Sequence, residues 1–145
     1  VKNMMHIKQL EHVMHIVTDV YGRKRKEVSL FEVIGAVFPA GTLSGAPKIR
    51  AMEIIAELEQ YRRNVYGGGI GFLHFNGNVQ LAIVIRSAFF EKPAFQDSER
   101  TRVFIQAGAG VVYDSIPEKE YAEIQHKRAS VVKVFEKNCN PQKGL

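Results

Sequence analysis

The sequence predicts an α+β domain in which an antiparallel sheet packs against helices. Its segments follow one another as a strand pair, two helices, three further strands joined by hairpins, and a final helix. The turn Asn76-Gly77-Asn78 joins two stretches rich in β-forming residues, which is typical of a hairpin. Strands joined by hairpins run antiparallel, and helices grouped outside them give an α+β arrangement.

The composition indicates one soluble domain. At 145 residues, with 46% hydrophobic residues, the chain is long enough to bury a core. No segment is apolar over the length of a membrane span and no secretory signal is present, so we expect a cytoplasmic protein without a membrane partner. Cys139 is the single cysteine and has no disulfide partner, in keeping with a reducing compartment. Because the chain begins Val1-Lys2 without an initiator methionine, we expect a fragment or a processed chain.

The net charge of +5 suits either a nucleic-acid surface or an anionic small ligand. Four consecutive basic residues, Arg23 to Lys26, follow Gly22 without interleaved aromatic residues. Such a run is more typical of a solvated turn than of a nucleic-acid interface. We therefore expect no nucleic-acid partner.

Residues 4–20 are expected to form two strands that meet at a tight turn near Glu11. A helix is possible, but β-branched residues dominate the second half. His12 and His15 are three residues apart, which places them on opposite faces of a strand and makes them a poor metal pair. The pattern alone gives neither histidine a role.

Two helices are expected next. The first, from Ser29 to Phe38, has Ser29 and Glu32 at capping-box spacing and ends before Pro39. The second, 47–59, carries an apolar face that we expect to be buried.

The stretch between these helices, 38–53, has the composition of an anion-binding loop. Gly41 and Gly45 leave backbone N–H groups uncovered, while Thr42 and Ser44 add hydroxyls. Lys48 adds a positive charge beside the start of the helix that follows Pro47. An ordinary turn into a helix explains the spacing equally well, because the Gly-Lys-Ser/Thr phosphate-loop pattern is absent.

After the polar connector 61–66, a glycine-rich start leads into one strand and the hairpin turn into a second, Val79 to Phe90. The glycines indicate a bulge or a close backbone approach. Arg86 is exceptional within this apolar second strand. It is either exposed with its stem along the surface or held for a buried anion.

The third strand, from Arg102, follows a hydrophilic loop over 91–101. Gly108-Ala109-Gly110 interrupts this strand before it resumes at 111–113, and the interruption exposes backbone N–H groups.

A last helix is expected from a capping box at Ser115 to about Lys137. Glu120, Glu123 and Lys127 share one stripe of it, which is either a solvated face with a salt bridge or a pair of carboxylate ligands for Mg²⁺.

Three motifs in order, 39–48 (PAGTLSGAPK), 106–110 (QAGAG) and 114–120 (DSIPEKE), together with the Arg86 strand, resemble the chorismate-utilising enzymes. Within that family the anthranilate-forming branch, component I of anthranilate synthase, is the nearest match. The resemblance runs from the first residues to about Phe135. It implies that 1–145 is the C-terminal portion of a chorismate-binding catalytic domain with an α/β sandwich fold.

The resemblance implies a Mg²⁺-dependent lyase of tryptophan biosynthesis. Such an enzyme converts chorismate to anthranilate and pyruvate, using ammonia that a glutamine amidotransferase subunit (component II) releases from glutamine. The alternative within the family is component I of aminodeoxychorismate synthase, in the folate pathway. Thr42, Ala107 and Ala109 favour the anthranilate branch. An alternative from another class is a non-catalytic basic binding module.

The resemblance also implies the site residues. Arg86 would bind the enolpyruvyl carboxylate, Lys127 would neutralise the ring carboxylate or its metal, and His15 is linked to pyruvate elimination. The catalytic residues implied are His15 and Thr42; the metal ligands are Glu120 and Glu123; the substrate-binding residues are Gly41, Thr42, Tyr66, Arg86, Gly108, Gly110 and Lys127. A second Mg²⁺-binding glutamate of the family is missing, so we expect the 145-residue chain to be inactive by itself.

Overall fold

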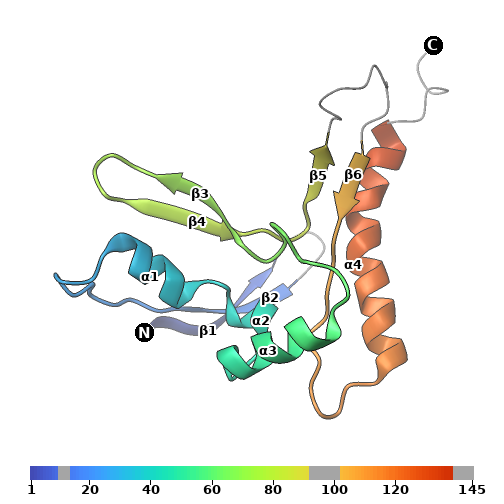
Figure 1. Cartoon of the computed structure of the whole chain (residues 1–145), viewed down its shortest axis with the longest axis horizontal. Coiled ribbons are helices and arrows are strands. Elements are labelled where there is room, and N and C mark those ends of the chain that lie inside the picture. Colours follow the sequence, from blue (N-terminus) through green and yellow to red (C-terminus); the bar gives the residue numbers. More distant parts are fainter. Residues whose placement is uncertain (10–13, 92–101, 139–145) are drawn as a thin grey trace. The chain divides into compact units, whose positions relative to one another are not determined.

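The structure is a computed structural model that describes residues 1–9, 14–91 and 102–138 (Figure 1). The chain divides into two units, Val1–Ala36 and Val37–Leu145, and each is described by itself. The expected turn near Glu11, the loop 92–101, His12 and Cys139 lie outside the described residues.

The first unit holds the expected strand pair. Strands β1 (Lys2–Gln9) and β2 (Met14–Asp19) are antiparallel, with Lys8 opposite His15. Helix α1 (Leu30–Val37) starts at the predicted capping box. The Ser29 N–H donates to Glu32 Oε2 over 2.7 Å, and the Glu32 N–H donates to Ser29 Oγ over 3.2 Å. These hydrogen bonds lower the pKa of Glu32, because they favour its charged form.

The second unit contains the remaining elements, and with them the α+β class is confirmed. Its helices are α2 (Gly41–Ser44), α3 (Lys48–Leu58) and α4 (Pro117–Asn138). Its strands are β3 (Gly69–Leu73), β4 (Val79–Ile83), β5 (Ala88–Glu91) and β6 (Arg102–Ile105). Within the described ranges the strands form three separate antiparallel ladders, β1–β2, β3–β4 and β5–β6, and no single continuous sheet.

The expected strand from Val79 to Phe90 is interrupted, because the chain changes pairing partner there. β4 pairs with β3, whereas β5 pairs with β6. Arg86 lies in the break with φ +53°, in the left-handed region that non-glycine residues adopt rarely. The expected resumption of the third strand at 111–113 is also wrong, since these residues are irregular or in a turn.

Helix α4 runs alongside the β5–β6 ladder (Figure 1). Phe90 of β5 and Phe135 of α4 meet edge to face, with ring centroids 5.5 Å apart. Aromatic pairs of this geometry add to the free energy gained from burial. The hydroxyl of Ser115 accepts the N–H of Val112 over 3.0 Å, upstream of the helix, so the cap differs from the predicted capping box.

The expected core is almost absent from the described residues. Val84, 5% exposed, is their one buried hydrophobic side chain. The apolar face of α3 is not buried as predicted; Leu58, for example, is 75% exposed. Burial needs an opposing layer, and the short α2 that neighbours α3 covers little of it.

No single helix among the described residues is long and apolar enough to cross a membrane, although the bent pair Leu30–Val37 and Gly41–Leu58 passes that test when counted together.

The glycines 67–71 were expected to mark a bulge or a close backbone approach, and at Gly71, inside β3, two backbones do approach closely. A Cβ at Gly71 would collide with the backbone carbonyl of Gln80 on β4. We expect Gly71→Ala to destabilise the β3–β4 ladder by about 1–3 kcal/mol. Amide hydrogen exchange across the ladder should accelerate roughly 5- to 150-fold.

A matched control for this prediction is Gly35→Ala in α1, where a Cβ would meet nothing within 4 Å. That substitution should leave exchange in the ladder unchanged and slow it in α1, because alanine favours helix. Equal exchange rates for Gly71→Ala and the original chain would contradict the close approach.

Candidate functional site

The first motif contains a short helical turn, α2, in the stretch where the sequence left an anion-binding loop and an ordinary turn into a helix equally open. The N–H groups of Leu43 and Ser44 both donate to the Ala40 carbonyl, over 2.8 and 3.1 Å. Ser44 is 4% exposed, and its hydroxyl donates to the Gly45 carbonyl over 3.1 Å. Ser44 is therefore structural, whereas the side chain of Thr42 is exposed.

Lys48 begins α3, directly after Pro47. Its Nζ donates to the Val37 carbonyl over 3.4 Å, and its side chain is half-buried. This contact supports a role for Lys48 in holding the helix start against the preceding chain.

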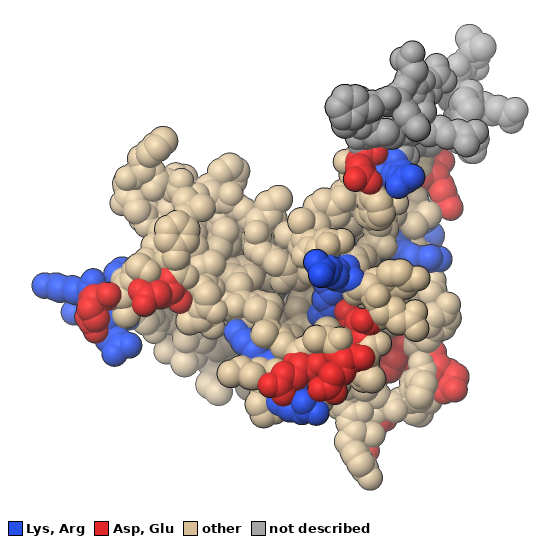
Figure 2. Space-filling model, in the orientation of Figure 1, with Lys and Arg blue, Asp and Glu red and all other residues tan. Residues whose placement is uncertain are grey.

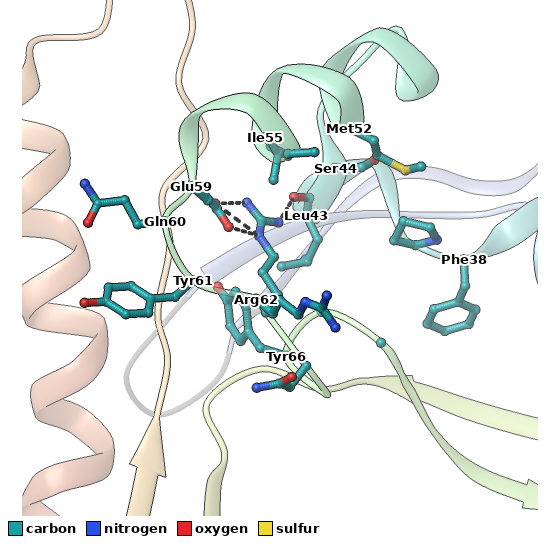
Figure 3. A pocket seen from close by; sticks show the side chains of 16 residues that line it. Phe38, Leu43, Ser44, Met52, Ile55, Glu59, Gln60, Tyr61, Arg62 and Tyr66 are labelled. Carbon is teal, nitrogen blue, oxygen red and sulfur yellow. Dashed lines mark hydrogen bonds and ion pairs between the residues drawn. The ribbon is translucent and has the colours of Figure 1, made fainter.

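Arg63 joins the connector after α3 to the turn of the first motif. Its guanidinium forms a two-pronged ion pair with the Glu59 carboxylate, and its Nη1 donates to the Leu43 carbonyl over 2.7 Å. Figure 3 shows these bonds as dashed lines at Glu59 and Leu43. In sequence, 61–66 has only the composition of a polar connector. Glu59 and Arg63 are four residues apart, but this spacing predicts an ion pair only on a helix, and α3 ends at Leu58, so the sequence holds no clear signal for the pair.

A pocket of about 700 Å³ lies beside this ion pair (Figure 3). Its lining includes Phe38, Ser44 and Tyr66. Tyr66 is thus the one predicted substrate-binding side chain that contributes to the lining, while Arg86, Glu123 and Lys127 lie outside it.

Four of the predicted site residues meet at the start of the segment between β6 and α4. Lys127 Nζ forms an ion pair with Glu123 and donates to the Gly108 carbonyl over 3.0 Å. The Tyr66 hydroxyl is 3.1 Å from the position that a Cβ on Gly108 would occupy. Gly108 therefore lies between the lysine of α4 and the tyrosine of the connector, and a larger residue there would push against the tyrosine.

Arg86 adds a second positive charge to this group. The pKa of Glu123 lies below its ordinary value, mainly because of its hydrogen bond with Lys127, then because of the charge of Lys127, and also because of the charge of Arg86. Glu123 is therefore a carboxylate at neutral pH. We call Tyr66, Arg86, Gly108, Glu123 and Lys127 the charged cluster.

The carboxylates of α4 fit a partial metal site. Glu120 and Glu123 are three residues apart on α4, about one helical turn, and Glu123 is in the ionised form that a hard cation needs. Among the described residues no group of three His, Cys, Asp or Glu side chains could hold a metal ion. Mg²⁺ commonly binds through one or two carboxylates plus substrate oxygens and water, so these two donors suit it.

The remaining predicted site residues lie elsewhere in the described chain. His15 belongs to the first unit, where its side chain is exposed on β2. Gly41 and Thr42 begin α2. Gly110 is exposed, and a Cβ there would meet nothing within 4 Å.

On the face that Figure 2 shows, the charged side chains of the described residues do not gather into one basic patch. Figure 2 shows lysines and arginines in small groups, several of them beside acidic residues, with wide uncharged areas between. Arg50, for example, pairs with Glu53 and Glu57.

Comparison with known proteins gives a consistent result. Residues 1–133 match the family model of the chorismate binding enzymes. The chain is 48% identical over 136 residues to "Anthranilate synthase component 1" of Acetivibrio thermocellus, covering 94% of this chain and 26% of that protein. It is 50% identical over 136 residues to the protein of the same name from Methanothermobacter thermautotrophicus, covering 94% and 28%.

A solved structure agrees with these sequence matches. The crystal structure of anthranilate synthase component I from Streptococcus pneumoniae superposes with a TM-score of 0.74 at 40% identity, over 90% of this chain and 28% of that one. The chain thus spans about a quarter of the length of the curated relatives it matches. The family model and these relatives cover nearly the whole of the described sequence, and the chain belongs to the chorismate binding enzyme family.

Proposed function

We propose that this chain forms part of the active site of an enzyme that converts chorismate to anthranilate. In that reaction ammonia forms a bond to a ring carbon and the ring hydroxyl leaves as water. Pyruvate then leaves, and the ring becomes aromatic. Chorismate and ammonia thus give anthranilate, pyruvate and water.

The observation that supports this proposal most is the charged cluster. Chorismate carries two carboxylates, and Arg86 and Lys127 are two cations close to one acidic side chain and to a glycine-rich backbone segment. In the proposed site Arg86 binds the enolpyruvyl carboxylate, and the Tyr66 hydroxyl and the Gly110 N–H donate at the same end. Gly108 lets Tyr66 approach the backbone closely.

The proposed Mg²⁺ would be held by Glu120 and Glu123, and it would supply positive charge to the ring carboxylate of the substrate. Lys127 keeps Glu123 ionised and helps to neutralise the bound carboxylate. Thr42 and the backbone of Gly41 contact the ring-proximal part of the substrate, and His15 serves pyruvate elimination. The further partner in the proposal is a glutamine amidotransferase subunit that provides ammonia, and the pathway is tryptophan biosynthesis.

The test uses a chimaera in which residues 1–133, the range that matches the family model, replace their counterpart in the Acetivibrio thermocellus relative. The two proteins are 48% identical over 136 aligned residues. With chorismate, ammonia and Mg²⁺, the chimaera should form fluorescent anthranilate, whereas the isolated 145-residue chain should not. An inactive but folded chimaera, with the parent relative active, would contradict the proposal.

The identity of the product separates the two branches of the family. Mass spectrometry should find anthranilate and free pyruvate in equal amounts. An aminated product that retains its pyruvyl group would show an aminodeoxychorismate-forming enzyme. The names of the relatives favour the first outcome.

A further inference from the structure

We propose that Arg63 is a positioning residue that holds the turn carrying Thr42 and the connector carrying Tyr66 in one arrangement. The inference rests on the proposed function, because it concerns the same substrate site. Arg63 was not among the residues that the motifs implied. The proposed role depends on the contacts of Arg63 within the protein and not on a contact with substrate.

The guanidinium of Arg63 is itself held in a fixed orientation. Its Nε lies 3.1 and 2.9 Å from the two Glu59 oxygens, and its Nη2 lies 2.6 Å from Oε1. Glu59 follows Leu58 as the C-cap of α3, and its N–H donates to the Ile55 carbonyl over 2.9 Å. The pair raises the pKa of Arg63, so the guanidinium remains charged.

The third nitrogen of the Arg63 guanidinium, Nη1, donates to a carbonyl that has no partner within the short helix α2. Carbonyls in the last turn of a helix have no partner within the helix, and Leu43 stands in the last turn of α2. Nη1 of Arg63 donates to that carbonyl over 2.7 Å, and the contact is partly buried. Because the bond has a charged donor, it is stronger than a neutral one. Arg63 thus fixes the turn in which Gly41 and Thr42 lie.

The same residue anchors Tyr66 through the backbone. The Tyr66 N–H donates to the Arg63 carbonyl over 2.9 Å. The side chain of Leu43 lies beside Gly67, where a Cβ would be 3.4 Å from it. The N–H of Gly67 donates to Val84, next to the break that carries Arg86.

These contacts connect the first motif to the charged cluster. From Leu43 they pass through Arg63 to Tyr66, whose hydroxyl lies at Gly108, the residue that Lys127 binds. Loss of the Arg63 side chain would remove the bond that holds the α2 turn at Leu43. The residues proposed to contact substrate would all remain unchanged. We therefore expect weaker binding of substrate and not only a less stable protein.

The experiment compares Arg63→Met, Arg63→Lys and Glu59→Gln in the chimaera described above. Arg50→Met is the control, because Arg50 is an exposed arginine outside the pocket that pairs with glutamates on its own helix. The KM for chorismate should rise roughly 10- to 100-fold for Arg63→Met, since a small misplacement of substrate-positioning groups has effects of that size. Arg63→Lys should raise KM less than Arg63→Met does, because lysine keeps the charge but lacks the planar guanidinium that pairs with two oxygens. Arg50→Met should leave KM unchanged.

A merely structural role would lower the amount of folded enzyme, and so the apparent kcat, with KM unchanged. That outcome, or equal KM values for Arg63→Met and Arg50→Met, would overturn the inference. If Arg63→Met does not fold, the inference is tested with Arg63→Lys and Glu59→Gln. KM values for these two variants equal to that of the original chimaera would overturn the inference. Arg86→Ala in the same chimaera tests the proposed function separately from the positioning role of Arg63. Full activity of Arg86→Ala would refute the proposed function itself.

Discussion

Replacing Glu123 with glutamine in the chimaera is expected to lower anthranilate formation by more than about 100-fold at a fixed, low Mg²⁺ concentration. Even residues that only support a metal ligand change metal affinity 10- to 100-fold, so loss of a ligand's charge should have at least that effect. Glutamine preserves the shape of the side chain but removes the charge that pairs with Lys127. The measurement is initial rate against Mg²⁺ concentration.

Raising Mg²⁺ should partly restore the activity of Glu123→Gln, and this shift separates a metal role from a general loss of fold. Glu118→Gln is the matched control, because Glu118 is exposed on the same helix. Its Mg²⁺ dependence should equal that of the original chimaera. A Glu123→Gln variant with unchanged Mg²⁺ dependence would exclude Glu123 as a ligand.

Replacing Arg86 with alanine is expected to lower kcat/KM for chorismate by about 10- to 150-fold. This range corresponds to the loss of one charge-assisted hydrogen-bonded contact, worth about 1.5–3 kcal/mol. Arg86→Lys should lose less, because it retains the charge without the two-pronged geometry. Arg50→Ala is the control, since Arg50 is an exposed arginine that pairs with glutamates on its own helix.

The backbone of Arg86 offers a second, independent measurement. Its φ of +53° is strained for any residue with a Cβ. Arg86→Gly should therefore lose as much activity as Arg86→Ala but melt at a higher temperature than Arg86→Ala, because glycine relieves the strain. If both variants melt at the same temperature, the left-handed conformation is not kept in the folded chimaera.

Local signals in the sequence predicted the β3–β4 hairpin and the start of helix α1 well. The turn Asn76-Gly77-Asn78 forms as expected, with Gly77 at φ +84° and the His74 N–H donating to the Asn78 carbonyl over 2.8 Å. The Ser29 and Glu32 capping box also forms as predicted. In these cases residues close in the sequence determine the backbone, so a pattern of a few residues suffices.

The predictions that failed depend on contacts between segments far apart in the sequence. The apolar run from Val79 to Phe90 predicts one strand, but the structure has two, β4 and β5, because they pair with different partner strands. Pairing between distant segments leaves no local pattern in such a run. Likewise the ion pair of Glu59 and Arg63 forms beyond the end of α3, where helical spacing does not apply, and the bond from Arg63 to Leu43 spans 20 residues. Both appear only in the structure. The metal and catalytic roles stay predictions from the family resemblance.

The three two-stranded ladders have a consequence for the chain in isolation. Within the described residues each ladder consists of two edge strands, so each strand has one side with backbone N–H and C=O groups that no neighbouring strand pairs. Such edges accept further strands from any chain with a suitable stretch, and a lone two-stranded ribbon is only marginally stable. We therefore expect the 145-residue chain, expressed alone, to aggregate by pairing its strand edges with strands of other copies. A polypeptide that supplied strands to cover these edges would block this route to aggregation.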